Sequence, residues 1–215
     1  MFASMRRYRL ERGTMAGLAR RIDEDFAEQL AAQPGFVAYE LIDCGLGEFM
    51  TMSVFVTLEQ AEASRELARR WAEENDDLEF PRVEAAHGEI AVGRAAADML
   101  GDRHVGEPPK SVAIRRYRLH DGTVDELMRR VDGPFADRLE AMEGFAAWHV
   151  FDCGGGEILW TSFVRDVSAA EECDERTFRF VSEDLREFGL ERRVALAGRL
   201  LLSRARTELL EPAHA

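Results

Sequence analysis

Apolar positions along the first hundred residues follow the period of a helix in some stretches and of a strand in others. One set recurs every fourth residue: Leu18, Ile22, Phe26 and Leu30. It predicts an amphipathic helix over 14–33. A second helix is expected over 57–75, because Thr57 and Gln60 have the spacing of a capping box. Short apolar stretches bounded by turn residues predict strands over 5–10, 36–43, 48–56 and 84–94.

The same pattern recurs later in the chain without a gap. Arg6–Leu10 reappears as Arg115–Leu119, an offset of 109 residues, and about two fifths of the following positions are identical. One added residue in the second copy then brings Gly88 opposite Gly198. A repeat of this length indicates a duplicated structural unit. We therefore predict the order strand, helix, strand, strand, helix, strand twice.

This order predicts an α+β fold of two ferredoxin-like βαββαβ units with antiparallel sheets. The expected boundaries are a first repeat over 1–97, a linker over 98–111, a second repeat over 112–206 and a tail over 207–215. Gly and Pro residues mark the linker. Each sheet has helices on one face, so its other face needs a cover. The two repeats can cover each other within one chain, or each can face a second copy in a homodimer.

The first helix is expected to differ between the copies. The second copy has Gly133-Pro134 where the first has Glu24-Asp25. Proline inside a helix removes a hydrogen bond and clashes with the preceding turn. We expect the helix over 124–141 to bend or restart there, and its partner in the first copy to run straight.

Charge and composition exclude several classes of protein. With 28 basic and 41 acidic residues the net charge is −13, which is unsuited to nucleic acid. No uninterrupted apolar stretch could span a membrane, and the N-terminus lacks the apolar core of a signal peptide. The three cysteines form no disulfide framework, and no metal-ligand spacing occurs. We expect a cytoplasmic protein without a metal or cofactor.

Several motifs together resemble the antibiotic biosynthesis monooxygenase-like domains of the dimeric α/β-barrel superfamily. They are Arg6–Leu10, Gly13-Thr14, Pro34–Phe36, Asp43 in the hairpin and Ala61–Ser64 leading to Trp71. The resemblance covers nearly all of both copies. It implies two sheets packed face to face as a barrel and a pocket between each sheet and its helices. Activities in this family include cofactor-independent oxygenation of polycyclic phenols, haem degradation and small isomerisations, and many members have no assigned activity.

The candidate catalytic residues are Trp71, Asn75 and His87. Trp71 and Asn75 lie four residues apart on the second helix, so they share a face. The resemblance implies a Trp and an Asn in such a pocket, where an indole stacks on a flat substrate and an amide holds its oxygen. The alternative is that Trp71 fills the core, Asn75 ends the helix and His87 is structural. The second copy has Phe180 and Asp184 in place of Trp71 and Asn75.

The candidate ligand-binding residues are Arg7, Arg9, Arg116, Arg118 and His149. The arginines alternate with Tyr8 and Tyr117 along the first strand of each copy, so they point to the opposite face. They could bind an anion, or form salt bridges with residues such as Glu40, Asp43 and Glu89. His149 replaces Glu40 in the second copy and is either a general base or a structural residue.

These features leave three functions open. The first is binding of a small, flat aromatic or phenolic molecule, with cofactor-independent monooxygenation as its catalytic form. The second is a non-catalytic binding or stress-associated protein, and the third is a structural or oligomerising unit with filled pockets. Because the copies differ at the polar positions, we expect an open pocket in at most one half, beside Trp71 and Asn75. The other half should be filled by Trp148, Trp160 and Phe163.

Overall fold

The computed structural model describes residues 1–210 and confirms the predicted order of elements in both copies. The first copy consists of β1 (Phe2–Arg9), α1 (Met15–Arg21), a π-helical turn (Ile22–Phe26), α2 (Ala27–Ala31), β2 (Phe36–Gly45), β3 (Glu48–Phe55), α3 (Leu58–Glu74) and β4 (Arg82–Ala95). The second consists of β6 (Lys110–Arg118), α4 (Val124–Val131), α5 (Pro134–Glu140), β7 (Phe145–Asp152), β8 (Glu157–Val164), α6 (Val167–Arg179), a π-helical turn (Phe180–Asp184) and β9 (Glu191–Ala205).

Several short segments lie outside this repeated order, including 3-10 turns at Ala97–Met99 and Arg186–Phe188. The segment between the copies forms β5 (Gly101–Arg103), which pairs with the end of β9. Of the predicted tail, Thr207–Leu210 forms a 3-10 turn, and 211–215 lie outside the described residues. No helix among residues 1–210 is long and apolar enough to cross a membrane.

The chain folds into two units that do not follow its linear order. Unit 1 comprises Met1–His87, Leu100–Pro109 and Gly198–Leu209, and unit 2 comprises, among the described residues, Gly88–Met99, Lys110–Ala197 and Leu210. The last strand of each copy is thus divided between the units. In unit 2, β4 pairs with β7, and in unit 1, β9 pairs with β2.

Gly88 and Gly198 mark the points where these divided strands meet their new partners. A Cβ atom at Gly88 would lie 2.2 Å from the carbonyl oxygen of Asp152, and one at Gly198 would lie 2.8 Å from that of Asp43. Real side chains do not approach a backbone so closely, so each position requires glycine. The matched glycines of the repeat therefore permit this strand exchange.

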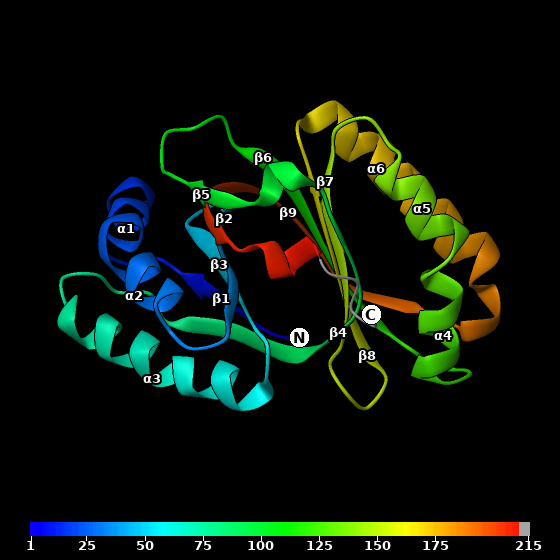
Figure 1. Cartoon of the computed structure of the whole chain (residues 1–215), viewed down its shortest axis with the longest axis horizontal. Helices are drawn as coiled ribbons and strands as arrows, with labels where there is room; N and C mark the ends of the chain where they lie inside the picture. Colours follow the sequence, from blue (N-terminus) through cyan, green and yellow to red (C-terminus); the bar gives the residue numbers. More distant parts are fainter. Residues whose placement is uncertain (211–215) are drawn as a thin grey trace. The chain divides into compact units, whose positions relative to one another are not determined.

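The hydrogen-bonding order of the strands is that of the dimeric α/β-barrel fold. The order is β2-β3-β1-β4-β7-β8-β6-β9-β5, and β2 also pairs with β9, so the order closes on itself. Within unit 1, α1, α2 and α3 lie along one face of the strands, and within unit 2, α4, α5 and α6 do the same (Figure 1). This confirms the predicted α+β class.

The first helices of the two copies differ near the predicted position. In unit 2, α4 ends at Val131 and α5 begins at Pro134, so the helix restarts as expected. In unit 1 the helix is unbroken, but its middle turn, Ile22–Phe26, is π-helical. The expectation of a straight helix did not include this turn. Such turns commonly occur next to functional sites.

Side-chain caps begin several of the helices. The expected capping box of Thr57 is present, and Thr123 forms a second one. α6 begins at Val167, because the Asp166 side chain accepts a hydrogen bond of 2.9 Å from the Ala169 amide.

Candidate functional site

A cavity of about 40 Å³ lies between the sheet and the helices of unit 1. Strand alternation turns one set of side chains of β1, β2 and β3 toward the helices. The polar side chains that line the cavity are Arg6, Tyr8, Tyr39, Thr51, Ser53 and Ser64. Its aromatic walls are formed by Phe26, Phe49, Trp71 and Phe80, together with smaller apolar side chains. The cavity therefore combines a group of polar side chains with walls of aromatic rings.

Arg6 is the charged residue that lines this cavity, and it lacks a carboxylate partner. Its side chain is 9% exposed, and its Nη2 atom has no hydrogen-bond acceptor among the described residues. Burial lowers the pKa of Arg6, and the positive charges of Arg65 and Arg82 lower it further. A buried guanidinium without a partner is costly.

Tyr39 presents a second unsatisfied group to the cavity. Its hydroxyl is buried and has no hydrogen-bond partner in residues 1–210. Burial is the main cause that raises the pKa of Tyr39, so the phenol stays neutral and can donate a hydrogen bond. Arg6 and Tyr39 therefore both offer donors to an acceptor atom placed in the cavity.

Trp71 lines the cavity from α3, and the π-helical turn fixes its ring. The indole Nε1 donates a hydrogen bond of 2.8 Å to Asp25 Oδ2. The ring centroid lies 5.3 Å from that of Phe26 and 6.4 Å from that of Phe80. Because Asp25 and Phe26 both belong to the π-helical turn, this turn determines the orientation of the indole in the cavity wall.

Asn75 and His87 are not among the residues that line the cavity. Asn75 follows the last turn of α3, where its Nδ2 donates a 2.8 Å hydrogen bond to the carbonyl oxygen of Trp71. Its Oδ1 accepts a 3.3 Å hydrogen bond from Arg21. His87 is exposed on β4. In this structure Asn75 caps a helix, and it supports the cavity through Trp71.

The four arginines expected on the opposite strand face are paired with carboxylates. Arg7 lies 3.6 Å from Glu48 and 3.2 Å from Glu84, and Arg9 lies 2.7 Å from Glu48. In unit 2, the corresponding Arg116 and Arg118 lie 2.8 Å and 3.2 Å from Glu157. These contacts correspond to the salt-bridge alternative, although the partners differ from Glu40, Asp43 and Glu89.

Glu40 and His149 occupy equivalent strand positions, and each is buried without a hydrogen-bond partner among residues 1–210. Burial raises the pKa of Glu40 to about 8 and lowers the pKa of His149 to about 4. Both groups are therefore neutral at pH 7. Two phenylalanine rings flank His149, with centroids at 6.1 Å and 6.2 Å.

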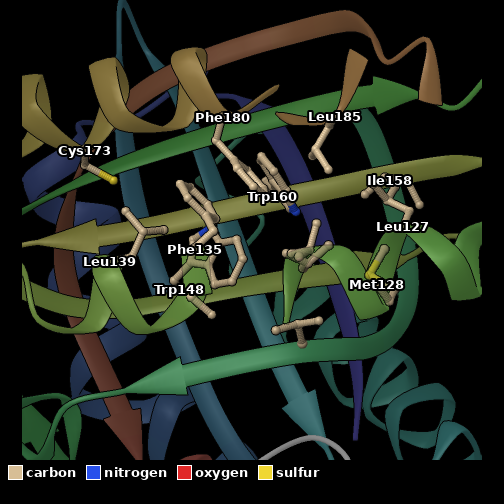
Figure 2. Close-up of a cluster of buried hydrophobic side chains, with 14 of the residues drawn as sticks. Leu127, Met128, Phe135, Leu139, Trp148, Ile158, Trp160, Cys173, Phe180 and Leu185 are labelled. Atoms are coloured by element: carbon tan, nitrogen blue, oxygen red, sulfur yellow. The ribbon is translucent and has the colours of Figure 1, made fainter. Parts of the chain in front are cut away.

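The corresponding space in unit 2 is filled with aromatic rings, but a pocket of about 330 Å³ lies beside them and is lined by Arg176, Phe180 and Asp184 among others, so the expectation of an open pocket in at most one half was wrong. Trp160 replaces Thr51, Trp148 replaces Tyr39 and Phe180 replaces Trp71. The rings of Phe135 and Phe180 stack at 3.8 Å, and the two tryptophan centroids lie 5.5 Å apart (Figure 2). All four rings belong to one buried cluster.

Phe163 does not contribute to this filling as expected. It alternates with Trp160 along β8, so it points to the other face of the sheet, where its ring lies near His149. Trp148 and Trp160 are the expected residues that belong to the cluster.

Comparisons with known proteins identify the fold. No protein-family model and no curated protein matches the sequence. A solved structure described as a “putative monooxygenase” from Fusobacterium nucleatum subsp. nucleatum is similar with a TM-score of 0.70 and 5% identity, over 95% of this chain and 94% of that chain. A second so described, from Lactobacillus acidophilus, has a TM-score of 0.70 and 7% identity, over 95% of each chain.

A third structure extends the same similarity. An anthrone oxidase-like protein matches with a TM-score of 0.57 and 14% identity, over 97% of this chain and 94% of that chain. The protein has a monooxygenase-like fold. At these identities the similarity establishes the fold alone, and function must be argued from the site.

Within this monooxygenase-like fold, the sequence analysis missed Arg6. It assigned Arg7 and Arg9 to one face of β1 and Tyr8 to the other. By the same alternation Arg6 shares the face of Tyr8, so the signal was present. Arg6 is the residue that gives the cavity its charge.

The described residues offer no evident metal site or reactive thiol. No group of three or more His, Cys, Asp or Glu side chains in residues 1–210 is arranged to hold a metal ion. Burial raises the pKa of both Cys44 and Cys153 to about 11, so their thiols are protonated at neutral pH.

Proposed function

We propose that unit 1 binds a small, flat aromatic molecule in the cavity between its sheet and its helices. The observation that carries this proposal is the pair of unsatisfied donors, Arg6 Nη2 and the Tyr39 hydroxyl, in an aromatic-lined cavity. Pockets for small ligands combine apolar walls with a few convergent polar groups. The rings supply stacking surface, and the donors fix an oxygen or an anionic group of the ligand.

The size of the cavity sets a condition on binding. About 40 Å³ is the space of a few water molecules, so an aromatic ring must displace a side chain as it enters. Phe80 is suited to move, because it is only half-buried and belongs to the loop that precedes β4. Binding is therefore expected to be accompanied by a shift of Phe80 away from Trp71.

Fluorescence titration with 2-naphthol and anthrone tests the proposal. The variant Trp71→Phe keeps most of the ring volume but loses indole stacking and the hydrogen bond to Asp25, so affinity should fall by about fivefold. The matched control is Trp160→Phe in the filled core of unit 2, which should leave affinity unchanged. Absence of binding, or equal effects of the two substitutions, would overturn the proposal.

Cofactor-independent oxygenation is the second candidate function, favoured by the presence of a buried cation beside aromatic walls. Such a site would hold a phenolate near O₂ and stabilise its charge. In the balanced reaction, a phenol and O₂ give a quinone and water: one oxygen atom becomes the new carbonyl, and the other leaves with two substrate hydrogens. None of the residues that line the cavity is a carboxylate or histidine base, so the substrate would enter as its anion. Consumption of O₂ with anthrone separates this function from binding alone.

A further inference from the structure

The arginine equivalent to Arg6 in unit 2 shows which chemical group this position binds. Arg115 lies 109 residues after Arg6, on the same face of the equivalent strand, and its side chain is 6% exposed. It forms an ion pair with Asp174 on α6, and its Nη1 lies 3.5 Å from Ser162 Oγ. In unit 2 the buried guanidinium is therefore paired with a carboxylate from α6 that is itself 61% exposed, and its Nη2 atom, like that of Arg6, has no hydrogen-bond partner among the described residues.

Unit 1 has no carboxylate at this position, although the serine beside the arginine is present in both units. Ser53 is retained at the position of Ser162, but Arg65 stands at the position of Asp174. Arg65 and Arg82 are exposed, and both repel the charge of Arg6. Arg6 is thus repelled by two further positive charges and has no hydrogen-bond acceptor for its Nη2 atom among the described residues.

A bound anion would compensate the positive charge of this arrangement. The repulsion among the three arginines and the burial of Arg6 both disfavour the empty site, and a bound carboxylate relieves both costs. A carboxylate also matches the forked geometry of a guanidinium, which a single phenolate oxygen does not.

We propose that the ligand of unit 1 is a flat aromatic carboxylate, whose carboxylate group takes beside Arg6 the place that Asp174 takes beside Arg115. This inference rests on the proposed function, in which the aromatic walls hold the ring. Arg65 and Arg82 add to the positive charge around Arg6, and Arg6 binds the anion. Unit 2 cannot bind such a ligand in this way, since Arg115 already forms an ion pair with Asp174 and Trp160 fills the space for the ring.

The test compares 2-naphthoate with the neutral 2-naphthamide, which has the same ring and nearly the same shape. For the unmodified protein, 2-naphthoate should bind at least about tenfold more tightly, because it alone can neutralise Arg6. Arg65→Asp restores an internal carboxylate and should weaken 2-naphthoate binding by about tenfold or more. Arg70→Asp is the matched control, since it makes the same charge change at an exposed position on α3, and it should change affinity less than about twofold.

The possible results separate this inference from the proposed function. Equal binding of both naphthyl compounds, weakened equally by Trp71→Phe, would keep the proposed function and overturn the carboxylate assignment. Equal effects of Arg65→Asp and Arg70→Asp would also overturn it. In a competition experiment against 2-naphthoate, inorganic phosphate that competes as well as benzoate would overturn it too. Failure of every aromatic compound to bind would reject both. Thermal melts of the two aspartate variants establish that each is folded.

Discussion

Units 1 and 2 have equivalent strands and helices, but the space between the sheet and the helices is packed differently in each. At one position of the third strand, unit 1 has Thr51 beside a cavity, whereas unit 2 has Trp160 within a cluster of rings. Beside the buried arginine of the first strand, unit 2 has the carboxylate of Asp174, whereas unit 1 has Arg65 at the equivalent position. The comparison shows that one half of a duplicated fold can fill with aromatic rings the space that the other half leaves as a cavity lined by polar side chains.

The largest difference is expected in how the two units respond to pH. Because burial raises the pKa of Glu40 from 4.5 to about 8, the folded protein keeps a proton that the unfolded chain releases between these values. The free energy of unfolding should therefore fall as pH rises from 4.5 to 8, by up to about 5 kcal/mol, at about 1.4 kcal/mol per pKa unit. Glu40→Gln should remove this loss in urea unfolding experiments.

His149, at the equivalent position, should respond in the opposite direction. Its pKa is lowered from 6.5 to about 4, so the unfolded chain takes up a proton that the folded protein refuses. Stability should fall as pH drops from 6.5 to 4, and His149→Gln should reduce that loss. A pH profile unchanged by both substitutions would show that neither group is buried in the neutral form.

The second prediction concerns the filled core of unit 2. Trp160→Ala should lower the free energy of unfolding by about 3–5 kcal/mol, because the surrounding rings can collapse only partly into the space that it leaves. The control is Phe178→Ala on α6, whose side chain is 66% exposed and whose loss should cost less than about 0.5 kcal/mol. Equal costs in denaturant titrations would contradict the assignment of Trp160 as the residue that fills unit 2.

A third prediction uses an ion pair that both units contain but bury to different depths. Asp23 pairs with Arg204 at 2.5 Å, with exposures of 11% and 3%, whereas the equivalent Asp132 pairs with Arg94 at 2.6 Å, with exposures of 34% and 22%. Asp23→Asn should cost about 2–3 kcal/mol, since it removes the nearer and more buried of the two carboxylates that face the Arg204 guanidinium. Asp132→Asn should cost about 1 kcal/mol or less, because water screens its pair.

Asp23 has additional partners that support this ranking. It also accepts hydrogen bonds of 2.9 Å from the Val105 amide and from His104 Nδ1. The charged groups close to the pair are His104 and Asp102, which lies 3.6 Å from Arg204. If chemical denaturation gave equal costs for the two asparagine variants, burial would not be what distinguishes the pairs.

The sequence was sufficient for the order of elements because local patterns determine them. The fourfold spacing of Leu18 and Phe26, the capping boxes and the Gly133-Pro134 break all act within a few residues. The division of β4 and β9 between units could not be predicted in this way. Strand partners are chosen by pairings across more than fifty residues, and both copies carry the same alternation. Gly88 and Gly198 align in the repeat, but the sequence does not show why glycine is needed there. The structure shows that each lies too close to the backbone of the neighbouring strand for a side chain.

The site was predicted in part. Trp71 was expected beside a pocket from its helical face, and it lines the cavity. Asn75 shares that face, but the end of α3 directs its amide to the Trp71 carbonyl. The absence of a partner for Arg6 depends on how α3 is placed over β1, and strand periodicity carries no such information. Comparing Arg65 with Asp174 in the two copies would have shown that the charge around Arg6 had changed.

The smallest effects are expected on the sheet face where the two units agree. Arg7 pairs with Glu48 and Arg116 pairs with Glu157, at equivalent positions, and these side chains are 20–29% exposed. Arg7→Gln and Arg116→Gln should each cost at most about 1 kcal/mol of stability. Neither should change the affinity for 2-naphthoate by more than about twofold, whereas Arg6→Gln, one residue away but on the cavity face, should weaken binding by at least about tenfold. Calorimetric titration of the three variants would measure both sides of this contrast. A loss of affinity in Arg7→Gln equal to that in Arg6→Gln would contradict the assignment of the anion site to the cavity face of the sheet.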